Sequence, residues 1–295
     1  MHRDRDTTPE DVMTTLKCAL ATACLLAFSA VATAQDYVFT APPRDVGSGD
    51  ENAVYGPVAA YLSAATGKKI VYEHSDNWLS YQDNMRKGKY DLMFDGPHFL
   101  SWRMAKLQHE PLAKLPGKLI FVVVAKKDND KVQTLKDLSG RTVCGMSPPN
   151  LATLTLHSQF TNAAREPMII PAKSFKEAYA NMAAGKCVAA AMGKGFYKNL
   201  EKGEAKIVWE SAGVPNQAFS ASPRFSEQDR AKMIAALTSP EARVKLAKFF
   251  EIFSKEKDLE VAKRDEFVGV SALLKDVYGF DTAASDVALT VATKK

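Results

Sequence analysis

LIFVVVAKKDNDK, Leu119–Lys131, is the stretch that decides how the chain divides. Its first half is the most strand-like run of the sequence, because apolar and mostly β-branched residues follow one another without a charge. Its second half, Lys126–Lys131, is polar, which favours a surface loop. We therefore predict a buried strand over Lys118–Ala125, followed by the first crossing of the chain from one lobe to another.

Outward from this strand, short apolar runs alternate with amphipathic stretches of helical period. Such alternation is typical of parallel sheets covered by helices, so the predicted fold class is α/β. The expected strands are Tyr37–Thr40, Lys69–Glu73, Tyr90–Phe94, Lys118–Ala125, Arg141–Met146, Met168–Ile170, Cys187–Met192 and Lys206–Trp209.

The same pattern predicts two lobes. A second α/β unit is expected to open at Leu135–Arg141 and to run to about Pro215, after which the chain becomes helical and returns to the first lobe. The expected boundaries are 35–124 plus 218–295 for lobe 1, and 125–217 for lobe 2. Two lobes joined by two crossings are suited to hinge closure around a ligand in the cleft between them.

The N-terminal segment has the build of a secretory signal peptide. Leu20–Ala34, LATACLLAFSAVATA, is apolar, follows Lys17 and ends in small residues. Residues 1–34 are therefore predicted to be removed, and the polar head before Met13 makes Met13 an alternative start. The apolar stretch is short for a membrane span, which needs about 20 residues, so export of the mature chain is expected.

Charge and motifs argue against two classes of function. Loss of residues 1–34 removes three of 39 basic and four of 34 acidic residues, and the remaining Lys and Arg are scattered, so nucleic-acid binding is not expected. The sequence has no Gly-x-Ser-x-Gly elbow, Walker loop, His-Glu-x-x-His or Cys-x-x-Cys pattern. Neither an enzyme nor a cofactor is predicted.

Cys144 and Cys187 are the cysteines that remain after export. An even number in a compartment that permits disulfides favours a bridge, and both residues are expected on neighbouring strands of lobe 2. The bridge would stabilise the fold by on the order of 4 kcal/mol, and Cα atoms more than about 7 Å apart would exclude it. The alternative is a thiol site for a soft metal or arsenite.

The predicted strand Tyr90–Phe94 is followed by Asp95, Gly96 and Pro97. Loops after strand ends face the cleft in such sheets, and Pro97 suits the first turn of a helix. Asp95 and His98 would then lie at a helix N-terminus that points into the cleft. The alternatives are that Asp95 only caps the helix and that His98 pairs with Asp95 or covers a surface. No metal site is predicted, since a closed site needs about four ligands.

Three stretches, taken in order, resemble the phosphate/phosphite/phosphonate-binding family of ABC-transporter periplasmic proteins. They are Tyr55–Ser63, Met85–Pro97 and Leu135–Val143, and the resemblance covers nearly the whole mature chain. It implies the two-lobe type II periplasmic binding protein fold, a periplasmic location and a small-molecule ligand. It also implies a monomer that serves an inner-membrane ABC permease or, alternatively, a sensor kinase.

The resemblance also implies site residues. Trp78 takes the place of a ligand-stacking aromatic residue, although it could instead pack its helix onto the sheet. Asn150, Ser174 and Gln217 fall at positions that line the family's cleft. Together with Asp95 and His98, these residues form the predicted ligand site.

The chain departs from the family pattern at two places. Family members that bind phosphonates usually carry a Ser-Thr-Ser-Gly turn, but Ser147–Thr153 reads SPPNLAT and has lost hydroxyl and N–H donors for an oxyanion. Asp95 stands where the family usually has an aromatic residue, and an unpaired carboxylate would repel a dianion. An aromatic residue plus an acid would suit a cationic or amine-bearing ligand, which is the alternative to an oxyanion.

Overall fold

The computed structural model describes residues 35–43, 50–200, 204–254 and 258–280. The predicted signal peptide lies outside the described residues. Among the described helices, none combines the length and the apolar character that a membrane crossing requires.

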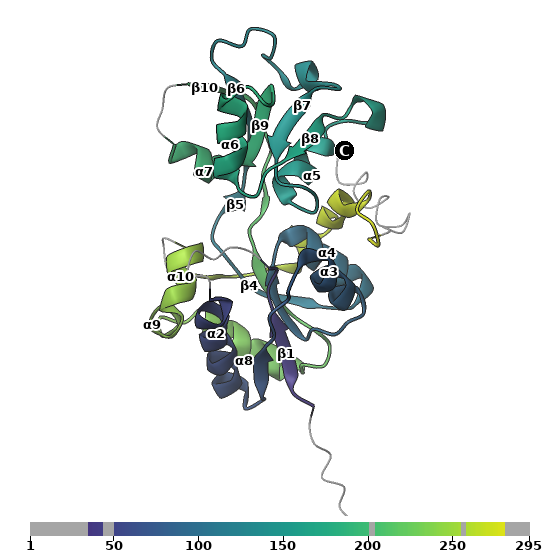
Figure 1. The fold of residues 1–295 in the computed structure, drawn as a ribbon. Coiled ribbons are helices and arrows are strands. Elements are labelled where there is room, and N and C mark those ends of the chain that lie inside the picture. The colour runs from purple at the N-terminus through teal and green to yellow at the C-terminus, as the bar shows by residue number, and fades with distance from the viewer. Residues whose placement is uncertain (1–34, 44–49, 201–203, 255–257, 281–295) are drawn as a thin grey trace, which may run out of the picture. The chain divides into compact units, whose positions relative to one another are not determined.

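Lobe 1 is built on a six-stranded sheet of order β13-β4-β12-β3-β1-β2 (Figure 1). Its parallel part is β2-β1-β3, and β12, β4 and β13 pair antiparallel, so the sheet is mixed. The strands are β1 Tyr37–Thr40, β2 Ile70–Tyr72, β3 Leu92–Asp95, β4 Glu110–Lys114, β12 Ala218–Ala221 and β13 Glu260–Val261. The packed helices are α2 Glu51–Thr66, α3 Trp78–Arg86, α4 Pro97–Lys106, α8 Glu227–Leu237, α9 Ala242–Lys245, α10 Ala247–Phe253, α11 Arg264–Phe267 and the 3-10 helix η3 Val270–Leu274.

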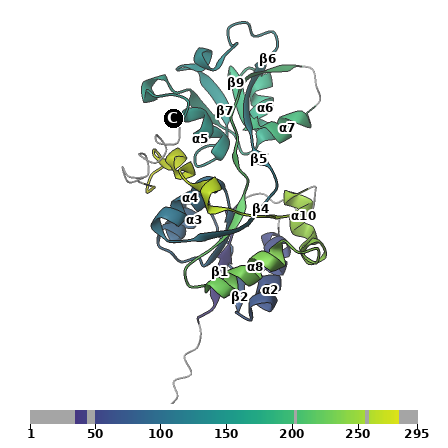
Figure 2. The same ribbon diagram turned by 180° about the vertical axis from the view of Figure 1, so that it is seen from behind.

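Lobe 2 is built on a five-stranded sheet of order β10-β6-β9-β7-β8, whose strands are labelled in Figure 1 and seen from behind in Figure 2. The strands β9, β7 and β8 run parallel, whereas β6 pairs antiparallel with β9 and β10. The strands are β6 Phe121–Lys126, β7 Thr142–Gly145, β8 Met168–Pro171, β9 Ala189–Gly193 and β10 Ala205–Glu210. The helices are α5 Leu151–His157, α6 Phe175–Ala183, α7 Lys194–Lys198 and the 3-10 helices η1 Leu135–Leu138 and η2 Ala163–Arg165.

Two short strands carry the chain between the lobes. β5, Lys118–Leu119, pairs antiparallel with β11, Val214–Pro215. The predicted boundary after Val124 is wrong, because β6 lies between β9 and β10 and belongs entirely to lobe 2. A strand flanked on both edges and covered on both faces needs a continuous apolar run, which is the pattern of Phe121–Ala125. The first crossing therefore precedes Phe121 instead of following the strand.

The two lobes differ in what fills their interiors. In lobe 1, α2, α8 and α10 enclose a cluster rich in aromatic rings, among them Phe39, Phe94, Phe219 and Phe249. In lobe 2, the two faces of the sheet are packed with Val and Ala side chains, including Val122–Val124 and Ala189–Ala191. Small side chains on β9 let helices approach closely on both faces of the lobe 2 sheet.

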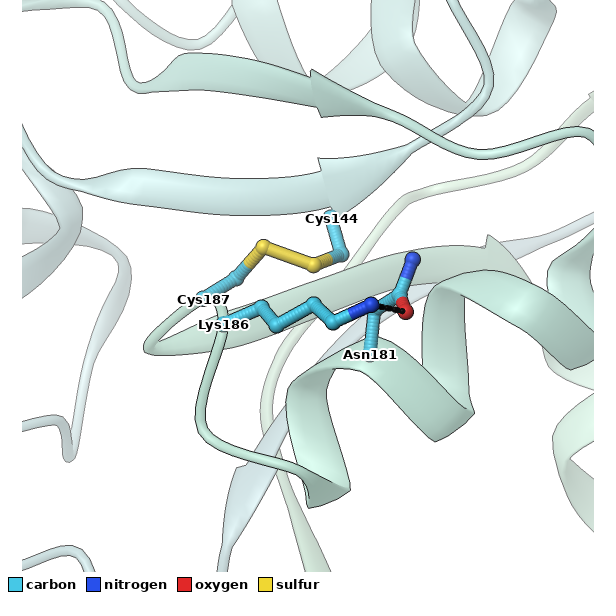
Figure 3. Close-up of a disulfide and its surroundings, with 4 residues drawn as sticks. All are labelled: Cys144, Asn181, Lys186 and Cys187. Atoms are coloured by element: carbon cyan, nitrogen blue, oxygen red, sulfur yellow. Dashed lines mark hydrogen bonds between the residues drawn. A yellow bond between two sulfur atoms is a disulfide. The ribbon is translucent and has the colours of Figure 1, made fainter.

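Cys144 and Cys187 form a disulfide in lobe 2 (Figure 3). Their Cα atoms are 5.6 Å apart, within the limit of about 7 Å that disulfide geometry allows, so the predicted bridge is confirmed. Cys144 lies on β7, and Cys187 lies two residues before β9, the neighbouring strand, so the bond ties the loop after α6 to the sheet. The side chain of Lys186 beside it donates to Asn181 of α6.

Candidate functional site

Trp78 is the first residue of α3. The preceding residue, Asn77, caps the helix by accepting a hydrogen bond from the N–H of Ser80. Trp78 is 36% exposed, and its indole ring rests against Tyr81 and Phe99, with ring centroids 6.0 and 6.4 Å away. The ring is therefore held from behind and leaves part of its surface open for stacking on a ligand.

Asp95 ends β3, as expected, but its side chain does not line an open cleft. It is fully buried and forms a two-armed ion pair with Arg103 of α4, with N–O distances of 2.5 and 2.8 Å. The hydroxyl of Tyr81 donates to the same carboxylate. Nor does Asp95 cap α4, because the N-cap is Gly96, without a side-chain cap bond. The prediction that Asp95 faces the ligand is corrected on physical grounds, since a buried carboxylate requires a paired cation.

His98 lies in the first turn of α4 and is buried. Its ring stacks on Phe99 at a centroid distance of 4.1 Å and lies directly over Gly96. A Cβ atom at position 96 would stand 2.6 Å from the imidazole Cε1. The glycine is thus needed for His98 to fold back across the start of the helix.

Asn150 is the N-cap of α5, where its Oδ1 accepts from the N–H of Ala152. Its Nδ2 lies 3.4 Å from the Met146 sulfur, and the Thr153 hydroxyl donates to the Met146 carbonyl. The turn that replaces Ser-Thr-Ser-Gly therefore uses its own side chains to satisfy its backbone. Leu151 and Ala152 of the same turn are buried against Phe121.

Ser174 lies in lobe 2, whereas Gln217 lies at the second crossing between the lobes. Ser174 is exposed and caps α6 by accepting from the N–H of Glu177. Gln217 lies between β11 and β12, where its carbonyl accepts from the N–H of Leu115 at 2.9 Å. Its amide side chain stands at the second crossing, half-buried.

Apolar clusters relate these positions to one another. Phe175, the residue after Ser174, packs against a cluster of Phe121, Leu151 and Ala152, as do Leu119 and Val214 of the crossing strands. Leu154 of α5 joins a lobe 1 cluster that contains Tyr81 and Phe99, the residues behind Trp78 and His98. The structure therefore connects Trp78 with His98 through Phe99, and packs Phe175 against a cluster that contains the two residues after Asn150.

Arg103 and Tyr81 were missed in the sequence analysis, although they decide the electrostatics. Arg103 is the one permanently charged residue in the buried run His98–Met104, and a cation there is the signal that could have revealed a buried partner. Burial alone lowers the pKa of Arg103, but Asp95 and Tyr81 outweigh it and hold the pKa above its ordinary value. Burial and the neighbouring Arg103 lower the pKa of His109 to about 2, so His109 is neutral.

In the part of the chain that the structure describes, no three His, Cys, Asp or Glu side chains come together in an arrangement that could hold a metal ion. The cysteines of the proposed thiol alternative are joined to each other.

Comparisons with known proteins agree with the fold. Over 109 residues the chain is 28% identical to the phosphate-import protein PhnD of Mycolicibacterium smegmatis, and the match spans only 34% of that relative's length. PhnD1 of Prochlorococcus marinus in complex with methylphosphonate superposes with a TM-score of 0.62 at 15% identity, covering 81% of this chain and 97% of that one. XAC2383 of Xanthomonas citri bound to ATP gives 0.63 at 14%, covering 81% and 96%.

These structural likenesses establish the two-lobe type II periplasmic binding protein fold and confirm the predicted class. Residues 45–278 match the family model described as "ABC transporter, phosphonate, periplasmic substrate-binding protein". The members of that family are components of transporters and not enzymes. Because the model matches most of the sequence, the chain belongs to the family of periplasmic substrate-binding proteins of phosphonate ABC transporters.

Proposed function

We propose that this protein binds a phosphorus oxyanion, inorganic phosphate or a small phosphonate, and delivers it to an inner-membrane ABC permease. The observation that carries the proposal is the ion pair of Asp95 with Arg103. An unpaired carboxylate in the site would repel an anion and favour a cation. With its charge neutralised inside lobe 1, Asp95 no longer argues for an amine ligand.

The remaining candidate residues suit an oxyanion. Trp78 offers an aromatic face to the organic part of the ligand, and His98, at the start of α4, is connected to Trp78 through the ring of Phe99. Asn150, Ser174 and Gln217 carry amide and hydroxyl groups, which can donate hydrogen bonds to phosphoryl oxygens. Side-chain donors would thus replace the backbone N–H groups at the start of α5, where the N–H of Ala152 already donates to Asn150.

The proposal also covers the export of the protein and the way it acts in the periplasm. Residues 1–34 direct export and are removed, and the mature chain works as a monomer in the periplasm. The ligand favours the closed arrangement of the lobes in proportion to its extra affinity for that state. Closure would then be the signal that the permease recognises.

The test uses residues 35–295, unfolded and refolded to remove any co-purified ligand. Thermal shift and calorimetry would compare phosphate and methylphosphonate with choline and tetramethylammonium. A ligand at 100 times its Kd should stabilise the protein by about 2.7 kcal/mol. We expect only the phosphorus oxyanions to do so. Stabilisation by the quaternary ammonium ions alone would contradict the proposal.

A matched variant tests the place of binding. Trp78→Ala should weaken binding, because it removes the one partly open aromatic ring at the start of α3. Leu79→Ala is the control, since Leu79 is 69% exposed on the next position of the same helix. Equal affinities in both variants would remove Trp78 from the site.

A further inference from the structure

We propose that the buried Asp95–Arg103 ion pair and the Tyr81 hydroxyl position the ligand site, by holding the first turns of α3 and α4 so that Trp78 and His98 meet one ligand. The proposal rests on the function proposed above, because it gives a role to residues that lie behind the site. It treats Asp95, Arg103 and Tyr81 as positioning residues that do not themselves touch the ligand.

The ion pair joins four elements at one point. Asp95 is the last residue of β3, Arg103 lies in the second half of α4, and Tyr81 lies in α3. The guanidinium also donates to the Ser220 hydroxyl of β12 at 2.8 Å and to the Met85 sulfur of α3 at 3.1 Å. Asp95 and Arg103 are both fully buried, so water does not weaken these bonds.

Aromatic contacts connect the Tyr81 ring with the candidate ligand residues Trp78 and His98. Tyr81 packs edge to face against Trp78 and against Phe99, with centroids 6.0 and 5.9 Å away. Phe99 in turn stacks on His98. The hydrogen bond from the Tyr81 hydroxyl to Asp95 therefore fixes the position of a ring that contacts Trp78 directly and His98 through Phe99.

Stability alone gives a weak reason for charges in this place. A well-packed apolar group often stabilises a core as much as a buried ion pair does, because desolvation offsets the attraction. The neighbouring residue of the same strand, Phe94, packs against the rings of Phe219, Phe249 and Phe253 in an apolar cluster. Lobe 1 thus fills one face of β3 without charges and keeps its buried ion pair on the face beneath α3 and α4. Directional hydrogen bonds fix geometry in a way that apolar packing does not.

The chain offers a matched control at the other end of β3. Asp91, which directly precedes the strand, pairs with Arg224 at 2.7 Å and accepts hydrogen bonds from Val38 and Ser222. This pair also connects β1, β3 and the segment after β12. The pair contacts Val38 and Ser222, which lie outside α3 and α4. Its loss should loosen lobe 1 without changing Trp78 or His98.

The experiment compares the charge-neutral double variant Asp95→Leu/Arg103→Met with the control Asp91→Asn/Arg224→Gln. The Kd for methylphosphonate is measured by calorimetry at a temperature where each variant is fully folded. A second measurement follows acrylamide quenching of Trp78 in a Trp102→Phe/Trp209→Phe background, which leaves one of the three tryptophans. Quenching needs no ligand and reports whether the indole has moved.

We expect the Asp95→Leu/Arg103→Met variant to raise Kd by about tenfold or more, since small displacements of contact groups have large effects, and to increase quenching of Trp78. The control should leave both readouts unchanged even if it lowers Tm. Unchanged Kd and quenching in the folded double variant would overturn the proposal. If the double variant does not fold, Tyr81→Phe carries the same test, because it removes only the hydroxyl.

The outcomes also separate the two proposals. If the unmodified protein binds none of the phosphorus oxyanions, the proposed function fails and the quenching comparison alone decides on positioning. If methylphosphonate binds and both double variants bind it equally well, the function stands and the positioning role is refuted.

Discussion

Lobes 1 and 2 are held together by different chemistry. Lobe 1 combines a core of aromatic rings with the Asp95–Arg103 pair beneath α3 and α4. Lobe 2 combines a core of Val and Ala side chains with the Cys144–Cys187 disulfide. An ion pair acts in the native state and depends on charge, whereas a cross-link acts mainly on the unfolded chain. The two lobes should therefore respond to different perturbations.

The largest effect is expected from Arg103→Met alone. The change leaves the buried Asp95 carboxylate without its cation, which costs as much as about 5 kcal/mol. Urea unfolding of residues 35–295 would measure the loss, and hydrogen exchange should place it in lobe 1. Adding Asp95→Leu should restore most of the stability. A single variant as stable as the unmodified protein would mean that Asp95 is not charged in the fold.

Removing the disulfide comes next, and it should affect the other lobe. Cys144→Ala/Cys187→Ala should lower the free energy of unfolding by about 4 kcal/mol, the loop-entropy value for a loop of this length. Hydrogen exchange should quicken on β7 and β9 and stay unchanged on β3. Faster exchange throughout both lobes would show that the lobes unfold as one unit.

Low pH should destabilise lobe 1 through protonation of His109. The pKa of His109 is lowered to about 2 in the fold, against an ordinary value of 6.5. Between these two pH values the unfolded chain is therefore protonated at His109 and the native state is not. This contribution is complete above pH 6.5 and is lost as the pH falls, by about 2 kcal/mol at pH 5. The variant His109→Gln should unfold with a flatter pH dependence in that range. Parallel pH curves for the two proteins would contradict the assignment.

The smallest effects compare two helix caps. Asn77→Ala should cost about 1 kcal/mol in lobe 1, and Ser174→Ala about as much in lobe 2, because each loses one capping hydrogen bond. Ligand affinity then distinguishes them. Asn77 caps the helix that begins at Trp78, whereas Ser174 is itself a candidate donor. A loss of affinity in Ser174→Ala that exceeds its loss of stability would place Ser174 at the ligand.

Much of the fold follows from local patterns. The strands at β1, β2, β7 and β8 were predicted within two residues, because apolar runs and turns bound them clearly. β4, Glu110–Lys114, was not predicted, since Pro111 and its charged ends hide a strand. The boundary at Val124 failed because the apolar run of β6 does not say which sheet it joins. Pairing partners are set by tertiary contacts that no local pattern contains.

The candidate site shows the same limit. Sequence placed Asp95 correctly at the end of a strand and Trp78 on a helix, whereas the helix-capping positions of Asn150 and Ser174 were not predicted. The direction of the Asp95 side chain was wrong, because it depends on Arg103 from the following helix and Tyr81 from the preceding one. A carboxylate looks the same in sequence whether it meets solvent, a ligand or a buried cation.

The burial of the disulfide sets an order of events in biosynthesis. Cys144 has no exposed surface and Cys187 has 5%. Thiol–disulfide exchange needs direct access of one sulfur to another, so an oxidoreductase cannot reach these atoms after the core of lobe 2 has closed. Oxidation must therefore come first and closure second. Protein produced in a reducing compartment would fold with free thiols sealed inside, and later exposure to an oxidant would correct it only as fast as lobe 2 opens.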